Sequence, residues 1–291
     1  MTDGKFLSVL AKVSRNGSYY FTEDELYHVA ALRTRNKGGC IGGAIVAGGI
    51  LTIGISIVFG EAFATLRFIL IGILWLGLIA AAVMMQRKII PRKTWDGIVK
   101  TWKVKRGEIP GLIREAGLHE APPKQIEPDI HDYGAANLIV CQQDIQVDWL
   151  VLNEFHSGYA ALVISENGYP GYIAIKADEL LQTNPDMKVF LLHDAGPEGE
   201  AMQQRILNDW PVQESQIRDL GITNAMLDTF GVNEKVREAF GVNFPLHAIP
   251  YHQLSTLLSR SITDTSGGDF TYYWAITYGE DGDLESDGDF G

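Results

Sequence analysis

The sequence predicts an α/β protein in which a parallel-sheet, Rossmann-like cytoplasmic domain follows a two-helix transmembrane hairpin. Two observations lead to this prediction. Between residues 40 and 85 only Glu61 and Arg67 are charged, whereas the rest of the 291-residue chain has the composition of an ordinary soluble protein. From residue 136 onward, short apolar runs alternate with helix-compatible stretches, which is the pattern of parallel strands joined by crossover helices.

Two apolar runs are long enough to cross a bilayer. Residues 40–59 and 68–85 carry no charge, and a helix of about 20 residues spans the roughly 30 Å hydrocarbon core. The segment between them allows only a turn, so we expect one helical hairpin; a buried core hairpin is the alternative. Because 39 mostly polar residues precede the first run, a cleaved signal peptide is excluded.

Positive charges flank the predicted hairpin on one side. Lys and Arg precede the first run and follow the second, while the connecting loop holds one Glu and one Arg. The positive-inside rule therefore predicts that both termini are cytoplasmic and that the protein lies in the inner membrane. The runs hold no acid, base or histidine, so they indicate an anchor rather than an ion path. Small residues that permit close helix packing, within the hairpin or between copies, are Gly39, Gly43, Gly48 and Gly49.

The soluble parts are expected to be an N-terminal segment, 1–39, a juxtamembrane linker, 86–130, the main cytoplasmic domain, 131–279, and an acidic, disordered tail, 280–291. In the first part, Thr22 followed by Glu25 predicts a helix over 22–32 with a capping box. In the second, Trp95 and Trp102 are expected near the membrane interface.

Within the main domain the apolar runs predict five strands and one late helix. The strands are expected at residues 136–141, 160–165, 188–193, 220–222 and 247–250, and the amphipathic helix at 251–262. Each of the first three runs is followed by a helix-compatible segment, which predicts a buried, parallel central sheet.

Cysteine content and charge exclude several functions. Two cysteines cannot staple a secreted domain or build a Cys-rich zinc site, so a reducing compartment is expected. Residues 1–93 carry a net charge of +6 and residues 94–291 a net charge of −18. Because nucleic-acid binding depends on Lys and Arg, nucleic acid is not an expected partner. The basic flanks favour anionic lipid headgroups, so the expected partners are the bilayer and either another protein or a second copy of the chain.

Three strand ends carry motifs that resemble a TOPRIM domain. They are Gln142-Gln143-Asp144, Glu166-Asn167-Gly168-Tyr169-Pro170, and His193-Asp194-Ala195-Gly196-Pro197-Glu198-Gly199. The likeness, over roughly residues 132–222, is to the A subunit of type VI topoisomerases and the related meiotic double-strand-break protein. Arg218-Asp219-Leu220-Gly221-Ile222 is similar to that family's Leu-Gly motif.

This resemblance implies a degenerate catalytic site. Active TOPRIM domains bind Mg²⁺ through a Glu and an Asp-x-Asp pair, and Mg²⁺ prefers such oxygen ligands. Here the Glu position falls on Gln142 or Gln143 and the second Asp on Gly196, so only Asp194 remains. We therefore expect no catalysis and no cofactor. The alternative is a rebuilt Mg²⁺ site with Asp194 and Glu198 as the first ligands, helped by Asp144 and Glu166.

The sequence thus favours a membrane-anchored, noncatalytic binding or assembly module, part of a bacterial membrane complex, that binds its ligand at the three loops after the strands. The alternative is a metal-dependent nuclease or phosphohydrolase effector at the membrane, for example in defence or stress response. A third possibility is that the hairpin itself oligomerises and perturbs the membrane. Two simpler roles are expected at the loops: Asp144 as a helix N-cap, and Glu198 in a first helical turn that starts at Pro197.

Overall fold

The computed structural model describes residues 1–33, 52, 71, 73–77, 89–119, 135–230, 232, 234–264, 268 and 270–273. The four packing glycines, the acidic tail and most of both apolar runs lie outside these residues. No helix in the described ranges is long and apolar enough to cross a membrane. Of the two runs, only Thr52, Ile71 and the helical residues 73–77 are described.

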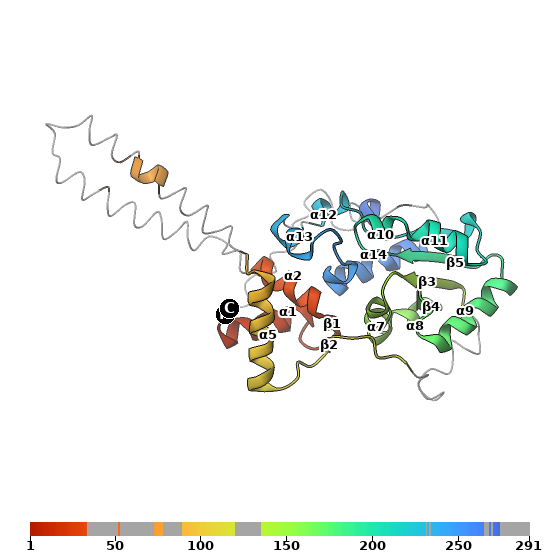
Figure 1. Ribbon diagram of the computed structural model, residues 1–291, viewed down its shortest axis with the longest axis horizontal. Helices are drawn as coiled ribbons and strands as arrows, with labels where there is room; N and C mark the ends of the chain where they lie inside the picture. The colour runs from red at the N-terminus through yellow and green to blue at the C-terminus, as the bar shows by residue number, and fades with distance from the viewer. Residues whose placement is uncertain are drawn as a thin grey trace.

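A four-stranded parallel sheet forms the centre of the domain (Figure 1). It consists of β3 (Asn137–Cys141), β4 (Ala161–Ser165), β5 (Lys188–Leu192) and β6 (Ile217–Asp219), in the order β4-β3-β5-β6. Cys141, the last residue of β3, pairs with Ser165 on one side and Leu192 on the other. The predicted parallel α/β architecture is confirmed, and the first three strands lie within one residue of their predicted positions.

Both faces of this sheet are buried, which explains why its strands are nearly continuously apolar. Alternate residues point to opposite faces, so Ile139 and Phe190 join one core cluster while Leu138 and Val189 join the other. The second cluster is covered by α9 (Gly171–Thr183) and α11 (Met202–Asp209). The first is covered by α7 (Asp144–Leu152) and α14 (Tyr251–Thr263). The helix predicted at 251–262 is therefore confirmed.

The N-terminal segment packs onto the first core cluster. It contributes α1 (Asp3–Val13) and α2 (Glu23–Arg33), which lie beside α5 (Arg92–Arg106) (Figure 1). Its two-residue strand β1 (Phe21–Thr22) pairs in parallel with β2 (Leu112–Ile113), after α5. Half of the predicted capping box is present, because Thr22 Oγ1 accepts the backbone N–H of Glu25 at 3.1 Å. The other half is not, because the Glu25 carboxylate accepts hydrogen bonds from the Tyr251 amide and Trp149 instead of the Thr22 amide.

Trp95 lies inside the protein and not at the membrane interface that its position predicted. Its side chain is fully buried on α5, with its ring centroid 5.8 Å from that of Phe6 and 6.2 Å from that of Tyr27. The segment that contains α5 is thus part of the folded domain. In sequence, α2 is the last described element before the first apolar run and α5 the first described element after the second, and both lie in one helical cluster with α1.

Two of the later strand predictions were wrong. Residues 220–222 follow β6, although the Leu220 and Ile222 amides still donate to β5 and the residue after it. Residues 247–250 overlap a 3₁₀ turn, η2 (Leu246–Ala248), between Pro245 and Pro250; side chains, not a neighbouring strand, bind its backbone. The remaining short helices are α8 (Phe155–Gly158), α10 (Pro197–Glu200), η1 (Glu214–Gln216), α12 (Met226–Thr229) and α13 (Glu234–Phe240).

Replacing Trp95 by Ala should destabilise the whole chain by about 3–5 kcal/mol, the usual cost of emptying a buried aromatic site. The measurement is thermal or urea unfolding of the full-length protein in a neutral detergent. Val104→Ala is the matched control, since Val104 lies on the same helix and is 82% exposed; it should change the stability by less than about 0.5 kcal/mol. Equal effects of both substitutions would contradict the burial of Trp95.

Candidate functional site

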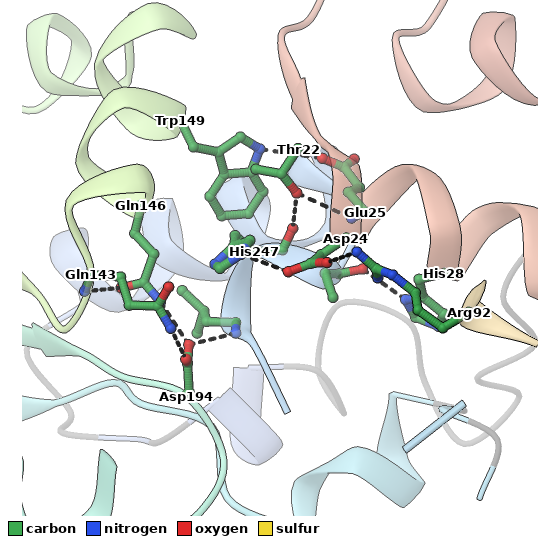
Figure 2. Close-up of polar contacts among 12 residues, drawn as sticks. Thr22, Asp24, Glu25, His28, Arg92, Gln143, Gln146, Trp149, Asp194 and His247 are labelled. Carbon is green, nitrogen blue, oxygen red and sulfur yellow. Dashed lines mark hydrogen bonds and ion pairs between the residues drawn. The ribbon is translucent and has the colours of Figure 1, made fainter. Parts of the chain in front are cut away.

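The carboxyl ends of β3 and β5 meet around Asp194, which is 3% exposed (Figure 2). Its Oδ1 accepts hydrogen bonds from Gln146 Nε2 at 2.7 Å and from the backbone N–H of Leu246 at 2.8 Å. Its Oδ2 accepts a hydrogen bond from Gln143 Nε2. Burial raises the pKa of this carboxyl group, while these donors and the nearby histidines favour its ionised form. Both oxygens are therefore occupied by neutral donors from the protein itself.

Three glutamines contact Asp194, two at its carboxylate and one at its backbone. Gln142 Oε1 accepts the backbone N–H of Asp194 at 2.8 Å, so this side chain presents its oxygen to the backbone. Gln143 is the N-cap residue of α7 and Asp144 the first helical residue, which corrects the prediction that Asp144 is the cap. Gln146 is fully buried and was not predicted as a site residue, since a glutamine inside a helix carries no signal of its own in a sequence.

Gly196 cannot be replaced by Asp without rearrangement of its surroundings. Its φ is +139°, and a Cβ atom added there would overlap the side chain of Asn243. Gly199 is equally close-packed, because a Cβ on it would overlap the carbonyl oxygen of Asp194. The loop after β5 is therefore shaped for glycine.

Two of the other acidic candidates, Glu166 and Glu198, contact residues other than Asp194. Both carboxylate oxygens of Glu166 bind Arg205, at 2.8 to 3.2 Å. Glu198 lies in α10, which starts at Pro197 as predicted, and its Oε2 lies 3.4 Å from Asn243 Nδ2. Oδ1 of Asp144 is buried without a hydrogen-bond partner among the described residues. Within the described ranges there is no group of three or more His, Cys, Asp or Glu side chains that could hold a metal ion.

The Gly-Tyr-Pro loop has a structural role. Gly168 adopts a φ of +77° and its amide donates to the carbonyl oxygen of Ser165 at 2.9 Å, forming the turn after β4. The next residue, Tyr169, donates its hydroxyl hydrogen to Asp148 Oδ1 at 2.6 Å. The other oxygen of Asp148 accepts the amide of Gly117 at 2.6 Å. This loop therefore ties the segment after β2 to α7.

His193 is hydrogen-bonded, as a histidine at the end of an apolar strand is expected to be. Its Nδ1 lies 2.8 Å from the carbonyl oxygen of Asp194, and its Nε2 lies 3.2 Å from Asp219 Oδ1 at the end of β6. Burial opposes protonation, but the Asp219 carboxylate outweighs it and raises the pKa of His193. Gly221 lies against the imidazole ring, where a Cβ would overlap it.

A second buried polar cluster, which the sequence did not reveal, joins η2 to α2 (Figure 2). Thr22 Oγ1 donates to the carbonyl oxygen of His247 at 2.8 Å, and His28 Nδ1 lies 2.7 Å from that of Ala248. The carboxylate of Glu25 accepts the Tyr251 amide at 2.9 Å and Trp149 Nε1–H at 3.2 Å. Backbone groups of His247, Ala248 and Tyr251 are thus bound by side chains of the N-terminal segment, and Trp149 of α7 holds Glu25 in place.

An ion-pair chain continues from η2 toward α5. His247 Nε2 lies 3.1 Å from Asp24 Oδ2, and Arg92 Nη2 lies 2.6 Å from Asp24 Oδ1. Burial alone raises the pKa of Asp24, but His247 and Arg92 outweigh it and lower this pKa. Since Leu246 binds Asp194, one polar path runs from the strand ends through η2 and α2 to the first residue of α5.

Comparisons with protein-family models, with curated proteins and with solved structures found no match to this chain. The fold and the site therefore identify a structural class and no family. The class is a parallel α/β domain with a closed polar cluster at its strand ends.

Gln143→Glu should destabilise the protein by about 2–3 kcal/mol at neutral pH, because it places a second buried carboxylate against Asp194. Near pH 5 the pair can share a proton, so part of this loss should be recovered. Urea unfolding at both pH values measures the loss of stability and its recovery. Gln143→Met is the control: it removes the hydrogen bond without adding charge and should show no such pH dependence. A variant as stable as the parent at both pH values would show that the two side chains do not touch.

His28 should make the protein less stable in acid. Burial lowers the pKa of His28 from 6.5 to about 4, so the unfolded chain takes up a proton first. The contribution of neutral His28 to the free energy of unfolding is complete above pH 6.5. It is lost as the pH falls toward 4, at up to about 1.4 kcal/mol per pH unit. His28→Asn keeps a donor for Ala248 but cannot titrate. The urea midpoint of the parent should therefore fall more steeply over this range than that of the variant; parallel profiles would contradict the assignment.

Proposed function

We propose that this protein is a membrane-anchored, noncatalytic binding and assembly module built on a degenerate TOPRIM-like domain. The observation that carries the proposal is the set of contacts of Asp194. Its two carboxylate oxygens accept hydrogen bonds from Gln143, Gln146 and the Leu246 amide. A metal ion would have to displace these donors, and it would find glutamine amides in place of the acidic ligands that Mg²⁺ prefers.

The arrangement of the other acids supports the same proposal over a hydrolase. Glu166 is engaged by the guanidinium of Arg205, and a two-metal phosphoryl-transfer mechanism needs several carboxylates within reach of both ions. Gly196, at the position where the family supplies a ligand, lies against Asn243. We infer that the three loops bind by shape and hydrogen bonding, with a protein partner or second copy as the ligand.

Features of the apolar runs support the anchor. Trp75 Nε1 donates to Thr52 Oγ1 at 3.1 Å, a contact between two residues that belong to different runs. Ile73 and Leu76, in the described part of the second run, are 64% and 74% exposed. Exposing large apolar side chains one helical turn apart is unfavourable in free energy in water and favourable in lipid.

The polar path from Asp194 to Arg92 supports a link between the binding loops and the anchor. A ligand that shifts the loop after β5 acts on Leu246, and through η2 on the helix that precedes the first apolar run. Buried hydrogen bonds rigidify the segments that they join. We infer that occupancy of the loops is transmitted to the membrane-proximal helices.

Metal titration of the full-length chain in neutral detergent tests the noncatalytic assignment. Calorimetry with Mg²⁺ and Mn²⁺ up to millimolar concentration should give no binding heat for the parent or for Asp194→Ala. Binding in the parent that is lost in Asp194→Ala would contradict the proposal and favour the hydrolase. Glu198→Ala is the matched control, since it removes an acid of the same loop that does not contact Asp194.

Extraction of cell membranes tests the anchor. The full-length chain should remain in the pellet after washing with alkaline carbonate and enter solution only with detergent. Release by carbonate alone would show that the two apolar runs do not span the bilayer.

A further inference from the structure

The helix α5 differs in charge from the rest of the domain. It carries six Lys or Arg residues and one acid, Asp96, whereas residues 94–291, which include most of α5, carry a net charge of −18. In Figure 1, α5 lies at one end of the domain, and α9 and β5 lie at the other. An acidic domain is therefore bounded by a basic helix at one end.

The sequence of α5 separates a buried side from an exposed side. Trp95 and Val99 are buried, and Trp102 packs against the same core cluster. This spacing of four and three residues marks one side of a helix. The opposite side, with the spacing i, i+4, i+7 and i+11, consists of exposed residues only, namely Lys93, Gly97, Lys100 and Val104. We call these four residues, together with the exposed Lys105 beside Val104, the α5 face.

The lysines of the α5 face are not neutralised by neighbouring acids. The other three cations of the helix have acidic partners, and these pairs are Arg92 with Asp24 and Asp96, Lys103 with Glu108, and Arg106 with Asp3. Among the described residues, no acid pairs with Lys93, Lys100 or Lys105. Three unpaired positive charges therefore lie along one helix.

The place of α5 in the sequence favours a bilayer as the partner of this face. Arg92, the first residue of α5, follows Met85, the end of the second apolar run, by seven positions. Such a linker spans at most about 25 Å, and basic residues this close to a membrane span attract anionic lipids. Val104 is 82% exposed, and an apolar side chain beside lysines suits the headgroup region of a bilayer.

The spacing of the lysines determines how α5 would lie on the bilayer. From Lys93 to Val104 the helix advances by about 16 Å, so the whole face reaches the headgroups only if the helix axis is parallel to the membrane surface. The acidic remainder of the domain is repelled by anionic lipids, which favours the same orientation.

We propose that the α5 face lies along the surface of an anionic bilayer, with Lys93, Lys100 and Lys105 in contact with the lipid phosphates. The inference deepens the proposed function and rests on its membrane anchor. A domain held in this way has one orientation on the membrane, with α5 next to the lipid and α9 and β5 away from it.

Lysine acylation of the full-length chain in bilayer discs tests this proposal. Discs of phosphatidylcholine alone and discs with equal parts of phosphatidylglycerol leave both bilayer surfaces open to a neutral acylating reagent, and mass spectrometry gives the rate at each lysine. Lys93 and Lys100 should react about five-fold more slowly, or less, in the discs with phosphatidylglycerol, since each lysine near an anionic surface contributes about five-fold to binding. Lys176 and Lys188, on α9 and β5, should react equally in both.

Two double variants test the role of charge. Lys93→Gln with Lys105→Gln should lower the docking equilibrium constant, measured from the protection of Lys100, by about 25-fold, or five-fold for each lysine. The control Lys176→Gln with Lys188→Gln removes the same charge at the opposite end of the domain (Figure 1). Lys100 should be protected in this control as it is in the parent.

Three outcomes would overturn the proposal. Equal rates at Lys100 in both kinds of disc would show that anionic lipid does not cover the α5 face; slow rates in both would indicate that another part of the chain or a second copy covers it. Equal weakening in the control would reduce the effect to net charge. A chain that does not enter the discs would contradict the anchor and with it the proposed function, whereas a chain that enters them with Lys100 unprotected contradicts the lipid contact alone.

Discussion

The binding of η2 from both sides is the constraint on which the rest of the domain depends. Asp194 holds the amide of Leu246, while Thr22, His28 and Glu25 hold backbone groups at His247, Ala248 and Tyr251. A buried segment without strand or helix partners must satisfy its backbone polar groups through side chains. Removing either set would leave buried groups unpaired, so the strand ends and the N-terminal helices stabilise each other.

This constraint gives the buried carboxylate of Asp194 a structural role at the strand ends. Asp194 is needed as an acceptor for three donors, a role that glutamine or alanine could not fill. Gln143 and Gln146 beside it act as donors. One buried carboxylate surrounded by amides costs less free energy than a group of buried carboxylates without a cation, so the composition of the cluster is consistent with its closed geometry.

The N-terminal helices also determine how the domain relates to the apolar runs. Because α2 precedes the first run and α5 follows the second, and both pack with α1 in one cluster, the runs form an insertion between two packed helices. Tyr27 ties the second entry point to α2.

The periodicity of the sequence was sufficient to predict the parallel sheet. Continuous Val, Ile and Leu runs separated by helical segments are typical of strands that are covered on both faces. It also located the loops at the strand ends. It could not predict η2, whose apolar residues suggested a strand, or the burial of Trp95, which composition alone placed near the membrane. Those outcomes depend on contacts between residues at least 52 positions apart in the sequence, the separation of Asp194 and Leu246. Only the tertiary structure brings their donors, acceptors and rings together.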